Sequence, residues 1–258
     1  MGKLLAIDGL NIVRRVYEAS PDEDSPDKAE VALRHSLSSF RRVLSTHQPS
    51  HVLAAFDYGG ATWRNEIYPL YRANRTPMPQ PLKERLPEFY AMLSKLGLTV
   101  VCLEGVEADD VIATAVLRWL GEGRGDAIVS STDVDLHVLI SSGALLWDQF
   151  KSEWHDRAWV EKKFGVPPEM LTDLLALCGD SANGIPGVEG IGPKSAAKLL
   201  TTYKTLEGIM AGAGILLTTT GQKLRAGRDM AFLSRELVKL KTDVRLGITW
   251  KMLQYDGR

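Results

Sequence analysis

Acidic side chains follow four predicted strands of this sequence, each at the point where its strand ends. Asp8 closes Leu-Leu-Ala-Ile-Asp, and Asp57 closes Leu-Ala-Ala-Phe-Asp. Two later strands lead into Val-Glu-Ala-Asp-Asp and Ser-Ser-Thr-Asp-Val-Asp, so the full set is Asp8, Asp57, Glu107, Asp109, Asp110, Asp133 and Asp135. Ligands of an open parallel sheet bind outside the carboxyl ends of its strands. We therefore expect these carboxylates to gather at one rim of a sheet.

Such a cluster favours metal-assisted hydrolysis. Clustered carboxylates repel one another at neutral pH unless cations neutralise them, and oxygen ligands select Mg²⁺ or Mn²⁺ over zinc. Two such ions lower the pKa of a bound water and neutralise the attacking and leaving oxygens of a phosphodiester, so no protein nucleophile is needed. The five histidines lack zinc-site spacing, and no Ser-His-Asp or Cys-His pattern competes. Taken singly, each acid has an alternative role as a helix N-cap or turn former.

Two basic residues follow the second strand. If Tyr71-Arg72-Ala73-Asn74-Arg75 is helical, Arg72 and Arg75 share one face and can grip the scissile phosphate. An isolated pair of this kind is more often a solvated surface, but the neighbouring acids favour the functional interpretation.

A glycine-rich loop, Gly187-Val-Glu-Gly-Ile-Gly-Pro-Lys-Ser-Ala-Ala, opens a predicted helix. It resembles a P-loop only superficially, because Pro193 separates Gly192 from Lys194 and no strand precedes it. Its amides can instead hold a DNA phosphate without reading bases, with Lys194 and Lys198 adding charge. The alternative is a plain turn whose glycines take positive φ.

The hydrophobic pattern predicts the elements that position these residues. Strands are expected at 3–7, 51–56, 98–103, 127–131 and 144–147, with helices between them at 27–46, 81–95, 108–120 and 134–139. This alternation indicates an α/β fold with a parallel sheet covered on both faces. Later helices are expected at 157–164, 168–178, 195–202 and 222–239. We expect an α/β domain over residues 1–155 and a helical subdomain over 156–258.

The composition fits one large α/β domain with an appendage: 258 residues, 45% hydrophobic and 24% charged. The net charge is −1, but it is unevenly distributed. Residues 181–258 hold 12 Lys and Arg against 6 Asp and Glu, whereas residues 1–180 hold 19 Lys and Arg against 26 Asp and Glu. This indicates a catalytic region beside a phosphate-binding one, although chance explains the charge alone equally well. No apolar run approaches the roughly 20 residues of a membrane span. With Cys102 and Cys178 interpreted as reduced core residues, we expect a cytoplasmic protein.

Together these motifs resemble the bacterial and phage 5′-nuclease family, also called flap endonucleases, which includes the N-terminal nuclease domain of DNA polymerase I. The resemblance covers nearly the whole chain and is greatest to the small bacterial flap endonucleases encoded apart from the polymerase. It rests on Leu-Leu-Ala-Ile-Asp-Gly (4–9), Phe-Asp (56–57) with Trp63-Arg64, Tyr-Arg-Ala-Asn-Arg (71–75), Glu-Ala-Asp-Asp (107–110), Ser-Thr-Asp-Val-Asp (131–135) and Gly-Asp…Ile-Pro-Gly-Val-Glu-Gly-Ile-Gly-Pro-Lys-Ser-Ala (179–196). It implies a PIN-like 5′-nuclease fold with a helix–three-turn–helix DNA-binding element around 177–196.

The resemblance also implies a metal-dependent enzyme that cuts flaps, nicks or overhangs near a free 5′ end, acting as a monomer. It implies binding of Mg²⁺ or Mn²⁺ by Asp8, Asp57, Glu107, Asp109, Asp110, Asp133, Asp135 and Asp180, with Arg72, Arg75, Asp109 and Asp110 as catalytic residues. The implied K⁺ site uses backbone carbonyls of Leu177, Cys178, Pro186, Val188 and Ile191. Implied DNA contacts are Lys83 and Arg85, on an arch or clamp at 77–98, and Gly190, Ile191, Gly192, Pro193, Lys194, Ser195 and Lys198 in the hairpin.

Two residues depart from the family pattern. Arg72 stands where Lys is usual, which keeps the charge but changes the donor geometry. Asn183 stands where the pattern Gly-Asp-x-x-Asp-Asn has its second Asp. Because an amide offers one oxygen and no charge, we expect one tightly bound divalent ion and a weaker second one.

Two other functions stay open at this point. A PIN-type ribonuclease would share the sheet and the acidic cluster, but it would need neither the glycine hairpin nor the arch. A DNA-structure-binding protein with weakened catalysis is hinted at only by Asn183. Parallel cleavage of flap DNA and single-stranded RNA separates the first alternative from the nuclease.

Overall fold

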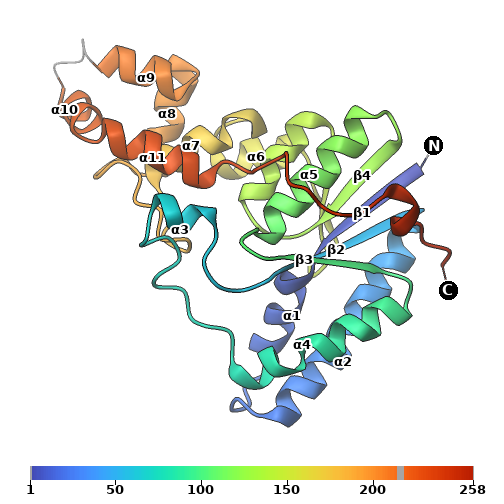
Figure 1. The fold of residues 1–258 in the computed structure, drawn as a ribbon. Coiled ribbons are helices and arrows are strands. Elements are labelled where there is room, and N and C mark those ends of the chain that lie inside the picture. The colour runs from blue at the N-terminus through green and yellow to red at the C-terminus, as the bar shows by residue number, and fades with distance from the viewer. Residues whose placement is uncertain (1, 214–217, 258) are drawn as a thin grey trace.

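The centre of the computed structural model, which describes residues 2–213 and 218–257, is a six-stranded sheet with the order β3-β2-β1-β4-β5-β6 (Figure 1). The strands are β1 (Gly2–Asp8), β2 (His51–Asp57), β3 (Thr99–Leu103), β4 (Gly125–Ser130), β5 (Leu145–Asp148) and β6 (Glu153–His155). All neighbours are parallel except β5 and β6. The predicted parallel sheet is confirmed, and the short antiparallel edge strand β6 is an addition to it.

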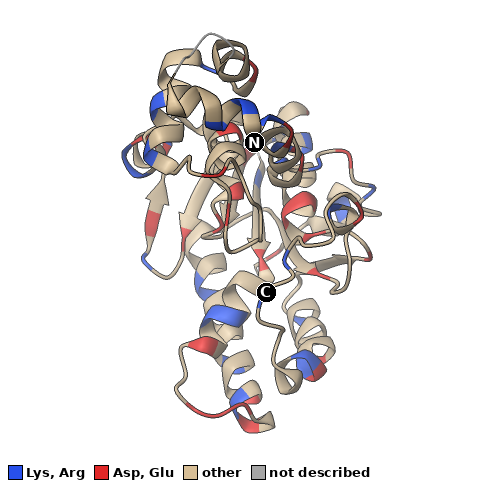
Figure 2. Cartoon of the chain, turned by 90° about the vertical axis from the view of Figure 1, so that its left-hand side faces the viewer, with Lys and Arg blue, Asp and Glu red and all other residues tan. Residues whose placement is uncertain are grey.

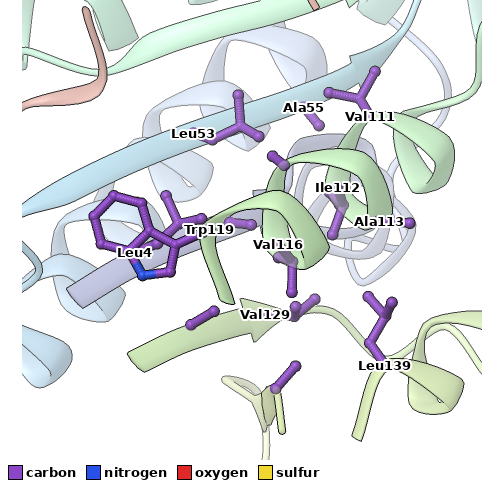
Figure 3. Close-up of a cluster of buried hydrophobic side chains, with 14 of the residues drawn as sticks. Leu4, Leu53, Ala55, Val111, Ile112, Ala113, Val116, Trp119, Val129 and Leu139 are labelled. Carbon is purple, nitrogen blue, oxygen red and sulfur yellow. The ribbon is translucent and has the colours of Figure 1, made fainter. Parts of the chain in front are cut away.

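Helices cover both faces of the sheet, as predicted. On one face lie α1 (Gly9–Glu18), α2 (Pro26–His47) and α4 (Gln80–Lys95). The other face is covered by α5 (Ala108–Gly121), whose buried Val111, Ile112 and Val116 pack on Leu4, Leu53 and Val129 of the strands (Figure 3). Truncating one such side chain to Ala typically costs about 2–5 kcal/mol. The site at the strand ends is therefore built on a rigid core.

The helical part follows β6 and has its own hydrophobic core. Its helices are α6 (Arg157–Phe164), α7 (Leu171–Cys178), α8 (Pro193–Tyr203), α9 (Leu206–Ala213), α10 (Thr219–Ala226) and α11 (Arg228–Val238). The 3-10 helices are η1 (Asp135–Ser142), η2 (Pro168–Met170) and η3 (Trp250–Leu253). One more short α-helix, α3 (Trp63–Ile67), lies earlier in the chain, between β2 and α4. After α11 the chain runs back over α5 to the sheet, where Gln254 pairs with His51 (Figure 1).

Some predicted elements differ from the structure. The helix expected at 222–239 is two helices separated at Gly227, where an added Cβ would lie 2.7 Å from Val188 Cγ1. Glycine therefore allows the close approach of this bend to the hairpin. The helix expected at 134–139 is the 3-10 helix η1, and the short α1, α3 and α9 were not predicted.

The expected arch segment at 77–98 consists largely of α4, which lies against the core. Leu82, Leu86, Phe89 and Leu93 are buried in the cluster shared with α2. Gln80, Lys83, Leu86, Pro87 and Tyr90 of α4 line a cavity at the rim of the sheet. No helix in the described ranges is long and apolar enough to cross a membrane.

Candidate active site

The first two strand-end carboxylates cap helices and also face a common cavity. Asp8 ends β1, and its Oδ1 accepts the Asn11 amide at 3.1 Å while its Oδ2 accepts the Ser131 hydroxyl at 2.8 Å. Asp57 ends β2 and accepts the Ala108 amide, at the start of α5, at 2.7 Å. The capping role is therefore real for Asp8, whereas Asp57 holds an amide of α5 from outside that helix, and each bond fixes the direction of its carboxylate.

Asp8, Asp57, Asp109 and Asp133 line one cavity of about 690 Å³, together with Arg14, Arg15, Arg72 and Arg75. These four acids come from three separate strand ends and the start of α5, so the predicted gathering at the rim is confirmed for them. In Figure 2, which faces this side of the molecule, acidic residues lie near the middle, and basic residues occur on helices above and below them.

Burial and mutual repulsion oppose ionisation of the cluster. Burial raises the pKa of Asp8 to about 7, with further contributions from Asp133 and Asp57. Burial also raises the pKa of Asp109 well above its usual range, as do the charges of Asp133 and Asp8. The pKa of Asp135 is raised by burial, then by Asp133 and Asp180. Carboxylates with raised pKa values gain most from a nearby cation, because the charged form is the one that the site disfavours.

Glu107 is held on all sides at the start of α5. Its Oε1 accepts the Thr62 hydroxyl at 2.8 Å, and its Oε2 accepts the Tyr71 hydroxyl at 3.1 Å. Arg72 Nη2 lies 3.1 Å from Oε2, and Arg64 Nη1 lies 3.3 Å from Oε1. With 2% exposure, Glu107 is a fixed anchor between these groups.

Asp110 departs from the expectation of a metal-binding catalytic acid. Its two oxygens bind Arg64 Nη1 and Nη2, each at 2.9 Å, and Trp63 Nε1 and the Lys241 amide also donate to it. The side chain is fully buried. It is not among the residues that line the cavity, whereas Asp109 is, because one residue step along a helix turns the side chain by roughly 100°. Asp110 is thus a partner of Arg64.

Arg72 lies among the carboxylates, on a turn, so the condition that residues 71–75 are helical is not met. Its φ is 55°, in the left-handed region that non-glycine residues rarely adopt. Besides Glu107, its guanidinium lies 3.9 Å from both Asp57 and Asp109. Arg75 is exposed at the cavity rim, where a phosphate could reach it.

Asp133 and Asp135 lie in the segment after β4, and Asp180 lies in the hairpin after α7. Asp133 Oδ1 accepts the Asp135 amide at 3.0 Å, which fixes the start of η1. Asp180 Oδ2 accepts the side-chain amide of Asn183 at 2.7 Å, and Asn183 Oδ1 in turn accepts Arg72 Nε at 2.9 Å. Asn183, one of the two residues that depart from the family pattern, therefore joins Asp180 to Arg72.

The donor set suits a hard divalent ion. Among the described residues, no three His, Cys, Asp or Glu side chains stand in a ready metal-binding geometry, and Arg72 lies between several of the acids. The acids that line the cavity nevertheless offer only oxygen ligands, which fit Mg²⁺ or Mn²⁺.

A second cavity of about 580 Å³ lies between the rim and the start of α4, and Asp57, Arg72, Arg75 and Lys83 are among its lining residues. Lys83 is exposed there, as expected of a phosphate contact. Arg85 pairs with Glu30 of α2 at 3.6 Å and with Glu88 at 3.5 Å. The structure thus directs Arg85 toward α2, and only Lys83 of the two borders the site.

The glycine hairpin between α7 and α8 is tightly folded. Gly179 and Gly187 have positive φ, and a Cβ on Gly179 would lie 2.6 Å from the carbonyl oxygen of Ile185. The Leu177 carbonyl accepts the Val188 amide at 2.8 Å. A carbonyl oxygen has a second lone pair, so this bond is compatible with the expected K⁺ site.

The hairpin presents the expected DNA-binding residues to solvent, with one exception. The exposed ones are Gly190, Gly192, Pro193, Lys194, Ser195 and Lys198. Ile191 is 4% exposed and packs in the helical core, so only its backbone can reach a ligand. No acidic residue occupies the first turn of α8, and Gly192 at its N-cap leaves the first amides without a side-chain partner.

Two further residues, Arg64 and Lys223, contribute to the site. Arg64 was noted only within a motif, yet it joins Asp110 and Glu107 to the carbonyl of Leu237 at 2.7 Å. Lys223 of α10 donates to the Gly190 carbonyl at 3.2 Å and adds a cation to the hairpin. Neither role has a sequence signal, because each depends on contacts between distant segments.

Two family models match the chain. The 5′-3′ exonuclease N-terminal resolvase-like domain matches residues 3–165, and the 5′-3′ exonuclease C-terminal SAM fold matches residues 166–258. The domain boundary near residue 155 stays a prediction. Similar proteins include the flap endonuclease Xni of Shewanella putrefaciens, 40% identical over 251 residues, which are 97% of this chain and 94% of that protein. Its counterpart in Shewanella amazonensis is 42% identical over 246 residues, 95% of each chain.

Solved structures share the fold. The T5 5′-exonuclease with bound divalent metal ions (zinc) aligns with a TM-score of 0.76 at 22% identity, covering 93% of this chain and 90% of that one. A bacteriophage T5 flap endonuclease complex with DNA and metal ions aligns with the same TM-score at 23% identity. At this level of identity the alignments show the fold alone, an α/β sheet domain followed by a helical domain.

Proposed function

This chain belongs to the 5′-3′ exonuclease family, and we propose that it hydrolyses branched DNA near a free 5′ end by holding Mg²⁺ or Mn²⁺ in its strand-end carboxylate cluster. It is a structure-specific 5′ nuclease of the flap endonuclease kind. The observation that carries the proposed mechanism is the single cavity lined by Asp8, Asp57, Asp109 and Asp133. The PIN-type ribonuclease is disfavoured, because both family models are 5′-3′ exonuclease domains and the similar proteins are flap endonucleases.

The residues at the cavity would have three roles: binding the ions, binding the phosphates and positioning α5. Asp8, Asp57, Asp109 and Asp133 would hold the divalent ion, which supplies an activated water and charge neutralisation when bound. Asp135 and Asp180 would contribute to a second ion. Arg75 at the rim and Lys83 on α4 would hold phosphates on either side of the scissile bond. Arg64 and Asp110 would keep the start of α5 in place.

The hairpin would hold the duplex part of the substrate. The free amides at the start of α8 and the exposed Lys194 and Lys198 suit a phosphate, and contacts of this kind read no bases. K⁺ bound by the carbonyls of Leu177, Cys178, Pro186, Val188 and Ile191 would add charge beside that phosphate. Replacing K⁺ with Li⁺ at constant ionic strength should then weaken DNA binding.

Asn183 makes the two ion sites unequal. It supplies no charge to the Asp135 and Asp180 side of the cluster, so we expect one tight divalent ion and a second that binds weakly. Because one chain supplies every carboxylate of the cavity, action as a monomer is proposed. Free thiols at Cys102 and Cys178 are compatible with a reducing cytoplasm, where we place the protein.

One experiment tests this function. Flap, nicked and blunt duplex DNA and single-stranded RNA, all 5′-end-labelled, are incubated with Mg²⁺, Mn²⁺ or EDTA, and the products are sized. Cutting near the flap junction in Mg²⁺ or Mn²⁺, with none in EDTA, is the expected result. Equal cutting in EDTA would overturn the metal mechanism, and preferential cutting of RNA would favour the ribonuclease.

A further inference from the structure

Two bonds join Arg72 to Asn183, the residues at which this chain departs from the family pattern. The Arg72 backbone amide donates to the Asn183 carbonyl at 2.9 Å, and Arg72 Nε donates to Asn183 Oδ1 at 2.9 Å. Arg72 lies in the segment between α3 and α4, whereas Asn183 lies in the hairpin of the helical part. The pair therefore links the two parts of the chain beside the cavity, which Arg72 and Ala182 line.

This link fixes where the positive charge of Arg72 goes. With Nε held by Asn183, Nη2 lies 3.1 Å from Glu107 and 3.9 Å from Asp109, and Nη1 lies 3.9 Å from Asp57. The planar guanidinium provides several donors in fixed directions, so one side chain can bind all of these partners. A Lys ammonium has a single nitrogen on a flexible stem and cannot.

Asn183 is the matching partner because it both accepts and donates. Its oxygen takes the Arg72 bond, and its Nδ2 donates to Asp180 at 2.7 Å. An Asp at this position would lose the donor and place a second negative charge against Asp180. An amide therefore suits a site in which the cation is a side chain, and a carboxylate suits one in which it is a metal ion.

We propose that Arg72 and Asn183 form a matched pair in which the Arg72 guanidinium is a built-in cation of the carboxylate cluster, limiting the free protein to one tightly bound divalent ion. The proposal rests on the proposed function for the identity of the ion site. The lack of a negative charge at Asn183 is one reason for a weak second ion. The proposal adds that Arg72 must also be replaced before a second ion binds tightly.

The test compares Mn²⁺ binding by the DNA-free protein in four forms: wild type, Arg72→Lys, Asn183→Asp and the double variant. Calorimetry gives the number of ions and their affinities, and Arg14→Lys is the control, because Arg14 lines the same cavity and pairs with Glu18. We expect one tight ion in wild type and in the control. We expect one in Asn183→Asp as well, because the new carboxylate pairs with Arg72. The double variant should bind two.

The two substitutions should also be non-additive, with the second ion binding about tenfold more tightly in the double variant than the sum of the single effects predicts. Two tight ions in Asn183→Asp with Arg72 intact, or only one in the double variant, would overturn the proposal. Should the double variant not fold, Arg72→Lys carries the test alone. Mn²⁺ must then raise its thermal unfolding midpoint, relative to EDTA, by more than it raises that of wild type, and an equal rise overturns the proposal.

These measurements use neither DNA nor cleavage. A chain that cut no flap DNA would refute the proposed function and leave the ion counts interpretable. Conversely, normal flap cleavage with two tight ions in Asn183→Asp would refute only the role of Arg72.

Discussion

Arg64 and Asp110 form a buried two-point ion pair, with both nitrogen–oxygen distances at 2.9 Å. Arg64 also donates to the Leu237 carbonyl at 2.7 Å and to the Lys239 carbonyl at 3.1 Å. The pair therefore joins the start of α5, which carries Asp109, to the end of α11 in the helical part.

Asp110→Asn should destabilise the protein without changing ion binding. Removing one partner of a buried ion pair typically costs about 3–5 kcal/mol, because the remaining charge stays buried. Urea unfolding measures this loss, and Mn²⁺ calorimetry counts the ions. Glu161→Gln, which breaks an exposed pair with Arg157, should cost less than about 1 kcal/mol. Loss of the tight ion in a folded Asp110→Asn protein would restore the metal-binding role that sequence suggested.

The metal-free protein should lose stability as pH rises from about 4 to about 7. Burial raises the pKa of Asp8 from 3.8 to about 7, so the folded state binds more protons than the unfolded state over this range. Stability therefore falls as pH rises through it. Urea unfolding in EDTA at several pH values checks the slope, which Asp8→Asn should reduce.

Mg²⁺ should oppose this loss, because it binds the deprotonated carboxylates of the folded state. The unfolding midpoint should gain more from Mg²⁺ at pH 8 than at pH 5. An equal gain at both values would show that the buried carboxylates are not the ion ligands.

Lys194→Ala should weaken DNA binding about equally on unrelated sequences. Lys194 is exposed in the first turn of α8, so it can contact a phosphate but no base in the proposed geometry. The slope of log affinity against log salt should become shallower by about one unit. Anisotropy titrations over a salt series measure this, with Lys251→Ala in η3, across the molecule in Figure 1, as the control. A loss confined to some sequences would mean that the hairpin reads bases.

The rim of carboxylates could be predicted from sequence because parallel strands end at one edge of the sheet. An Asp directly after such a strand must therefore lie at that edge, whatever its tertiary contacts are. The different roles of Asp109 and Asp110 could not be predicted in this way, because Arg64, which binds Asp110, lies 46 residues earlier in the sequence. The role of Arg72 was tied to a helix at 71–75, but a left-handed turn directs it into the cluster, where Asn183 and Glu107 hold it. The break of the 222–239 helix at Gly227 likewise depends on the approach of Val188.

Single-turnover cleavage of a 5′-labelled flap by Asp109→Asn, with DNA binding measured in parallel, tests the carboxylate cluster most directly. Asp109 faces the cavity and its charged form is disfavoured by burial, so the amide should fold normally in EDTA. We predict that the cleavage rate falls by orders of magnitude, while DNA binding stays equal or tightens because a negative charge facing phosphate is gone. Asp126→Asn, exposed at the start of β4, should cleave like wild type. Unchanged cleavage by Asp109→Asn would contradict the assignment of the active site.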